Sequence, residues 1–110
     1  MAGEQVFTYV DANPVEMVPG ITRRTLAQTD DMQIVEIRLK AGSEIPTHSH
    51  YHQQAEMLTE GEIVMVVDGK EYPCKSGDSW VIPGDIPHSA RVIADAIIVA
   101  CFSPAREDYQ

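Results

Sequence analysis

The residues with the clearest chemistry in this chain are its histidines. Three of the four lie in the segment Thr47-His48-Ser49-His50-Tyr51-His52, and the fourth, His88, follows Pro87. A β-strand sends alternate side chains to one face, so His48 and His50 would point the same way, and His52 would join them if the strand ran on. Two such imidazoles can bind one metal ion, and His88 could complete the set from a distant strand. Histidines are also found hydrogen-bonded in cores or paired without function on surfaces, and the cluster alone leaves these interpretations open.

The segments around the histidines have the pattern of short β-strands. Asp68-Gly69 predicts a hairpin, and Pro83-Gly84 ends a further strand. The expected strands are residues 33–39, 62–67, 70–74, 79–82, 88–92 and 97–102, with a turn at Ala94-Asp95. Short strands at this spacing predict an all-β sandwich or barrel. Cys101 is expected in the core and Glu56 on a solvated strand face.

The spacing of the histidines resembles the two motifs of the cupin superfamily. The first motif reads Gly, five residues, His-x-His, three or four residues, Glu, six residues, Gly. It is matched here by Gly42, His48-Ser49-His50, Gln54 and Gly61. The second reads Gly, five residues, Pro-x-Gly, two residues, His, and is matched by Gly77, Pro83 and His88. This resemblance implies a single-domain cupin, an antiparallel β-barrel of the double-stranded β-helix or jelly-roll type.

The cupin resemblance also implies one bound divalent transition metal. Its ligands would be His48, His50, Gln54 and His88, which suit Mn, Fe, Co, Ni and Zn alike. Gln54 stands where the superfamily usually has Glu, and Asp85 where it usually has Gly. Because a neutral Gln cancels none of the metal's charge, we expect a stronger Lewis acid that binds less tightly. Asp85 is expected to alter only a turn.

Further segments are similar to those of the small pectin-degradation cupins. These are Leu26-Ala27-x-x-Asp30-Asp31, His48-Ser49-His50-x-His52-Gln53-Gln54 and Phe102-Ser103-Pro104-x-Arg106-Glu107-Asp108-Tyr109. Members of that family ketonise 4,5-unsaturated uronates that polysaccharide lyases release. They are usually dimers and hold their metal on two His, a Gln and a third His.

The same family lines its pocket with an Asp, a Phe two residues later and an Arg four residues after that. Phe102 and Arg106 match, whereas Ala100 stands in place of the Asp. The resemblance implies a catalytic and carboxylate-binding Arg106, a pocket wall at Phe102 and a further substrate contact at His52. Without the Asp we expect weak or absent ketonisation, because a proton-transfer group contributes about 10²–10⁴-fold in rate. The alternatives are a surface Arg106 paired with Glu107 or Asp108, a Phe102 that only packs in the core, and a solvent-facing His52.

Several functions remain compatible with these residues. The leading interpretation is a metal-dependent isomerase or lyase that acts on a small anionic sugar such as an unsaturated uronate. The alternatives are an iron-dependent dioxygenase, a non-catalytic ligand-binding or sensing cupin, and a structural dimer with a vestigial site. Whether the chain is an enzyme is therefore open at the level of its sequence.

The length, charge and apolar content of the chain limit the kinds of partner that it is expected to bind. The chain has 110 residues, which fits one domain, and its formal net charge of −9 opposes binding to nucleic acid. No apolar run reaches the length of a membrane span, and the N-terminus lacks the pattern of a leader, so a cytoplasmic location is expected. The expected partner is a small anionic molecule.

The chain is expected to divide into an N-terminal arm, residues 1–19, and a cupin barrel with a C-terminal tail, residues 20–110. Val6 to Val10, ahead of the barrel, is rich in the β-branched and aromatic residues typical of strands. An unpaired edge strand favours association, so we expect the arm to pair with a second subunit and form a homodimer.

Overall fold

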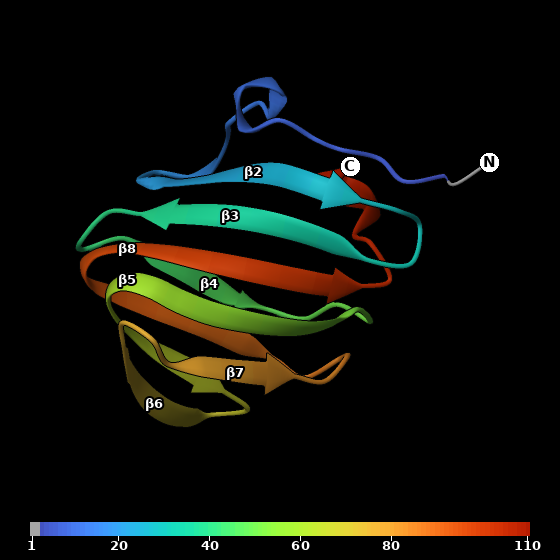
Figure 1. The fold of residues 1–110 in the computed structure, drawn as a ribbon. Helices are drawn as coiled ribbons and strands as arrows, with labels where there is room; N and C mark the ends of the chain where they lie inside the picture. The colour runs from blue at the N-terminus through green and yellow to red at the C-terminus, as the bar shows by residue number, and fades with distance from the viewer. Residues whose placement is uncertain (1–2) are drawn as a thin grey trace.

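The computed structural model describes residues 3–110, and over this range the chain is built almost entirely from β-strands (Figure 1). The strands are β1 (Val15–Val18), β2 (Ile21–Gln28), β3 (Gln33–Leu39), β4 (Glu44–His48), β5 (Gln53–Val67), β6 (Lys70–Lys75), β7 (Ser79–Ile82) and β8 (His88–Ser103). Two single-turn 3₁₀ helices, η1 (Tyr9–Asp11) and η2 (Glu107–Tyr109), lie near the ends of the chain. No helix within residues 3–110 is long and apolar enough to cross a membrane.

All the strand pairs are antiparallel, which confirms the expected all-β fold. The hydrogen-bonded order is β1-β2-β3-β8-β5-β6, with β4 added on β8 and β7 on β5. The two long strands, β5 and β8, pair twice: residues 53–60 with 97–103, and residues 62–67 with 88–94. Because both strands bend between these stretches, one pair of strands serves both sides of the barrel.

The bend in β5 occurs at Gly61, where the pairing with β8 contains successive register irregularities. Gln54, Glu56 and Leu58 face inward before the bend, and Ile63 faces inward after it, so the inward parity changes from even to odd. Gly61 has a φ of +95°, and a Cβ atom there would lie 2.3 Å from the Asp95 carbonyl oxygen. Only glycine permits this close approach.

The prediction of a turn at Ala94-Asp95 was wrong, because β8 runs without interruption from His88 to Ser103. The turn-forming residues mark the place where β8 crosses the bend of β5. They therefore signal a local irregularity in one long strand rather than a reversal of the chain.

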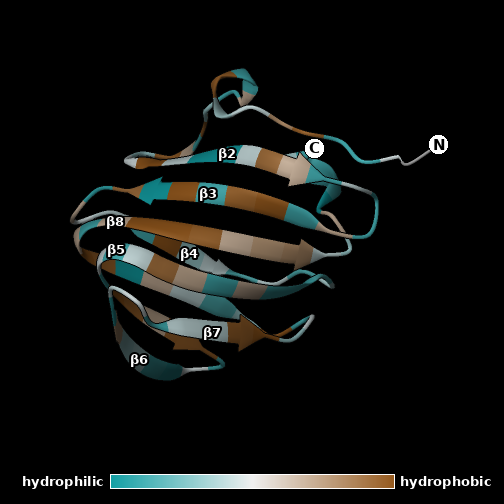
Figure 2. Cartoon of the chain, viewed as in Figure 1, coloured by the Kyte–Doolittle hydropathy of each residue, from teal (hydrophilic) through white to brown (hydrophobic). Residues whose placement is uncertain are grey.

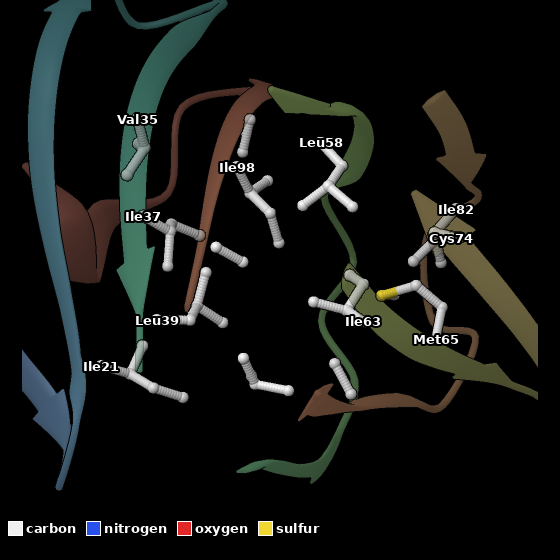
Figure 3. Packing of buried hydrophobic residues seen from close by; sticks show 14 of the residues in the cluster. Ile21, Val35, Ile37, Leu39, Leu58, Ile63, Met65, Cys74, Ile82 and Ile98 are labelled. Atoms are coloured by element: carbon white, nitrogen blue, oxygen red, sulfur yellow. The ribbon is translucent and has the colours of Figure 1, made fainter. Parts of the chain in front are cut away.

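The core lies between the facing sides of the bent sheet. Figure 3 shows side chains from β3, β5, β6, β7 and β8 meeting there, and Leu58, Ile63 and Ile98 are almost completely buried. Each buried Leu or Ile contributes about 1.5–3 kcal/mol relative to an exposed one. Figure 2 shows a largely hydrophobic β3 and β8 but a mixed β5. The first half of β5 carries the buried polar residues Gln54 and Glu56. Cys101 was expected in the core but is exposed, because it lies between the inward-facing Ala100 and Phe102.

The N-terminal arm is only partly separate from the barrel. β1 falls within residues 1–19 and pairs with β2, so this part of the arm extends the sheet. Residues 3–8 form no strand in the single chain, and Val6 and Val10 are 90% and 85% exposed. Pairing of this segment with a second subunit remains a prediction.

Candidate metal centre

Three histidines converge at one end of the barrel. His48 ends β4, His88 begins β8, and the two are direct partners in the antiparallel register. His50 lies in the connection between β4 and β5. One ring nitrogen from each of the three lies within 4.8 Å of the others, which is close enough for one shared metal ion. His52 does not continue the alternation because the strand ends at His48.

Each of these rings is oriented by a backbone carbonyl. The Nδ1 atoms of His48 and His50 lie 2.9 Å from the carbonyl oxygens of Pro46 and His52, and Nδ1 of His88 lies 2.8 Å from that of Ile86. Since a carbonyl can only accept, Nδ1 carries the proton and donates it, which leaves Nε2 with a free lone pair. The Nε2 atoms of His50 and His88 are buried and without a hydrogen-bond partner.

The surroundings of His50 and His88 favour the neutral form of their imidazoles. Burial and, second to it, the positive charge of Arg106 lower the pKa of His50 to about 4. Burial also lowers the pKa of His88. A neutral imidazole is the form that binds a metal ion, so both rings are ready to coordinate near pH 7.

Gln54 adds a buried oxygen to this group. It lies on β5 with its side chain directed inward, and its Nε2 donates to Oε1 of Glu56 at 2.6 Å. Its Oε1 is buried and has no hydrogen-bond partner. A buried acceptor without a hydrogen-bond partner is energetically costly. Oε1 of Gln54 is such an acceptor, and so are the Nε2 atoms of His50 and His88. This set of donors fits a divalent transition metal, with His48, His50 and His88 as the histidines that could hold it.

Glu56 is buried, so the expectation of a solvated strand face was wrong. Its Oε1 also accepts a hydrogen bond from Nε1 of Trp80 at 2.7 Å. Burial raises the pKa of Glu56, while the hydrogen bonds from Trp80 and Gln54 and the charge of Arg106 oppose the shift. Glu56 is also the direct partner of Ala100 across β5 and β8. The barrel therefore holds a carboxyl group opposite the position where the related family has Asp.

A small cavity of about 30 Å³ lies beside the histidines. Its lining includes His48, Gln54, Glu56, His88, Phe102, Arg106 and Tyr109. The cavity holds about one or two water molecules, so a larger ligand would have to enter from the open end or displace side chains.

Arg106 reaches this cavity from the C-terminal segment. Its side chain is 11% exposed, and its guanidinium carbon lies 5.3 Å from the ring centre of Phe102 and 3.9 Å from that of Tyr109. Nε and Nη2 donate to the two carboxylate oxygens of Asp108 at 3.2 and 2.9 Å. Arg106 thus lines the cavity and also forms the ion pair with Asp108 that the alternative interpretation expected.

Phe102 and His52 have different surroundings. Phe102 is buried, belongs to the core cluster and meets His50 edge to face at 5.9 Å, so it packs in the core and borders the site as well. His52 is buried, which excludes the solvent-facing alternative. Its Nε2 lies 3.2 Å from Oε1 of Glu107, and His52 does not belong to the group of three converging histidines. Contact of His52 with a substrate remains a prediction.

Tyr109 is a second residue of the cavity, after Glu56, that sequence reasoning missed. It lies in the turn η2, is buried in the core cluster and lines the cavity. Its ring is contacted by the guanidinium groups of Arg23 at 4.3 Å and Arg106 at 3.9 Å. Such contacts contribute about 0.5–2 kcal/mol each. The feature of the sequence that could have identified Tyr109 is its aromatic ring in an otherwise polar C-terminal tail.

The loop that carries His50 is held by the turn before β8. The Asp85 backbone N–H donates to the His50 carbonyl at 2.7 Å. Asp85 has a φ of +67°, a conformation that Asp tolerates better than most residues, which explains how it replaces the usual Gly. A Cβ atom on Gly84 would lie 2.2 Å from the Tyr51 carbonyl oxygen, so the loop and the turn are in close backbone contact.

The fold and the histidine group define a cupin, and comparison with known proteins agrees. Residues 35–102 match the family model described as Cupin domain, and the chain belongs to the cupin family. This confirms the single cupin barrel that the motif spacing implied.

The comparisons point further to the small cupins of pectin degradation. The chain is 25% identical over 96 residues to pectin degradation protein KdgF of Dickeya dadantii, covering 86% of this chain and 87% of that protein. The structure of KdgF from Halomonas sp. superimposes with a TM-score of 0.89 at 26% identity, covering 97% and 99% of the two chains. An RmlC-like cupin from Shewanella frigidimarina gives a TM-score of 0.90 at 30% identity, covering 97% and 96%. The chain is thus similar to KdgF-type cupins along almost its whole length.

Proposed function

We propose that this protein is a metal-dependent isomerase or lyase of small carboxylated sugars, with 4,5-unsaturated uronates as the first substrate class to test. The observation that carries the proposal is the placement of a guanidinium, that of Arg106, in the same cavity as the histidine group. The similarity to KdgF-type cupins supports the choice of substrate class.

The metal would be held by His48, His50, Gln54 and His88. Once bound, a divalent metal supplies a Lewis acid that polarises an oxygen of the substrate. The protein's own task at this point is to hold three rings and one amide in fixed orientations, which the backbone carbonyl partners of the histidines support.

Arg106 would bind the substrate carboxylate. Asp108 occupies the edge of the guanidinium formed by Nε and Nη2, so Nη1 remains available as a donor. The ring of Phe102 lies 5.3 Å from this guanidinium carbon and 5.9 Å from the ring of His50, so it would form an apolar wall of the site. The substrate would then be bound at two points, at its carboxylate and at the oxygen nearest to the metal.

The proton transfer needs a group other than residue 100, since Ala100 has none. Glu56 is the one carboxylic acid among the described residues that line the cavity, and it lies opposite Ala100. Sequence analysis placed this carboxyl group in solvent and therefore expected no proton-transfer group in place of the missing Asp. Its burial beside the cavity supplies a candidate for that group. We expect ketonisation that is slow but measurable, and sensitive to Glu56→Gln.

The test follows the loss of ultraviolet absorbance of an unsaturated uronate in the presence of metal-loaded protein. The wild type should accelerate the decay, His88→Ala should abolish the acceleration, and Arg106→Ala should raise KM about tenfold or more. Arg91→Ala is the matched control, because Arg91 is an exposed arginine paired with Glu71 on the outside of the barrel. A decay that wild type and Arg106→Ala accelerate equally would refute the assigned role of Arg106.

Ala100 favours a second candidate, a ligand-binding cupin without catalysis. In that case unsaturated uronates would bind, and Arg106→Ala would weaken the binding, but no decay of absorbance would follow. Equilibrium binding measured beside the kinetic assay separates the two functions.

A further inference from the structure

Gln54 and Glu56 form a hydrogen-bonded pair inside the barrel. Both lie on the first half of β5, both face inward and both are buried. Oε1 of Glu56 accepts two hydrogen bonds, from Nε2 of Gln54 at 2.6 Å and from Nε1 of Trp80 at 2.7 Å. Trp80 is the strand partner of Glu56 on β7, so the carboxyl group is fixed from two sides.

This pair determines which end of the Gln54 amide faces the histidines. A glutamine amide has a donor end and an acceptor end of nearly equal size, and either could turn toward a neighbour. A carboxylate oxygen accepts and does not donate, so Glu56 selects the NH₂ group. The amide oxygen of Gln54 is then left buried and without a partner. Without Glu56, nothing among the described contacts of Gln54 would hold that orientation.

The same contact explains why Gln rather than Glu stands at position 54. Nε2 of Gln54 lies 2.6 Å from Oε1 of Glu56. A glutamate at position 54 would place a second carboxyl group at this distance, where two ionised carboxylates would repel one another. The carboxyl group is therefore held at position 56, hydrogen-bonded to the amide NH₂ of Gln54, and not on the side chain that would contact the metal.

We propose that Glu56 is a positioning residue of the metal centre, which acts by presenting the Gln54 amide oxygen to the ion. The inference rests on the proposed metal binding, but it concerns affinity and ligand geometry and not turnover. Carboxylate partners of metal ligands typically contribute about 10–100-fold in affinity.

The experiment measures Co²⁺ affinity and the visible spectrum of the Co²⁺-loaded protein. Glu56→Met removes the acceptor and should weaken Co²⁺ binding about 10–100-fold, with a spectrum that shifts toward that of Gln54→Ala. Glu56→Gln keeps an oxygen that can accept from both donors and should stay closer to wild type. Glu62→Met is the matched control, because it removes an outward-facing carboxylate from the same strand and should change neither readout.

A double-mutant comparison tests the mechanism. If Glu56 acts through Gln54, then Glu56→Met should cost little further affinity once Gln54 is Ala. An equal loss in both backgrounds would show that Glu56 acts by its charge alone and would overturn the proposal, as would wild-type affinity and spectrum in Glu56→Met. Wild-type protein that binds no Co²⁺ would refute the metal site itself, so the two failures are distinguishable.

Discussion

Gly84→Ala tests how the His50 loop is held. The backbone of Gly84 does not have a positive φ, so alanine is conformationally acceptable and only its methyl group matters. That methyl would lie 2.2 Å from the Tyr51 oxygen and 3.0 Å from its carbonyl carbon. An ordinary contact requires about 3.5 Å, so the loop and the turn must separate by roughly 1 Å.

A separation of this size breaks the hydrogen bond between the Asp85 N–H and the His50 carbonyl, now 2.7 Å long. The lost bond and the overpacking together should lower the free energy of unfolding by about 2–4 kcal/mol. Because His50 moves with the loop, Ni²⁺ affinity should also fall about 10–100-fold.

Urea denaturation of the metal-free protein and calorimetric titration with Ni²⁺ measure the two effects. Gly77→Ala is the control, since Gly77 has a φ of +96° and a methyl group added there would meet nothing within 4 Å. It should lose about 1–2 kcal/mol of stability from backbone strain yet keep its Ni²⁺ affinity. Wild-type affinity in Gly84→Ala would refute the reasoning that this contact positions His50.

Three other predictions concern the ligands, the interior and the assembly. His88→Ala should strip most of the metal, and elemental analysis that finds the variant as loaded as wild type would exclude His88 as a ligand. Ala100→Asp adds a carboxylate directly opposite Glu56 at a fully buried position, so its free energy of unfolding should fall by about 1–3 kcal/mol, and adding Glu56→Gln should recover part of the loss in a denaturation assay. Light scattering should show a homodimer that Val6→Asp dissociates, because Val6 is 90% exposed on the arm proposed to pair with the partner; a monomeric wild type would contradict this.

The all-β fold was predictable from local patterns, and the histidine group was predictable from the resemblance to the two cupin motifs. Alternation predicted the bounds of β3, and Pro83-Gly84 marked the end of β7. The spacing of His48, His50 and His88 matches the cupin motifs, and the structure brings the three together. The long strands were harder, because Gly61 and Asp95 look like the ends of strands although they mark a bend within β5 and β8.

Burial of polar residues could not be predicted from residue type. Glu56 is charged and was placed in solvent, but its parity with Gln54 directs it inward, where Trp80 and Gln54 satisfy it. Cys101 is apolar and was placed inside, but the parity that buries Ala100 and Phe102 exposes it. In both cases burial follows from the position of the residue along its strand, and the polarity of the side chain predicted the wrong environment.

The pairing of His48 with His88 also has a kinetic consequence. These histidines are far apart in sequence and come together only when β4 docks on β8, so the complete set of ligands exists only in a chain that has closed. Closing distant strands is slow, because the chain loses entropy before the contacts form. An ion bound by this set would therefore stabilise the native state more than the transition state for folding. Its main effect should be to slow unfolding, which would make a metal-loaded protein long-lived without making it fold faster.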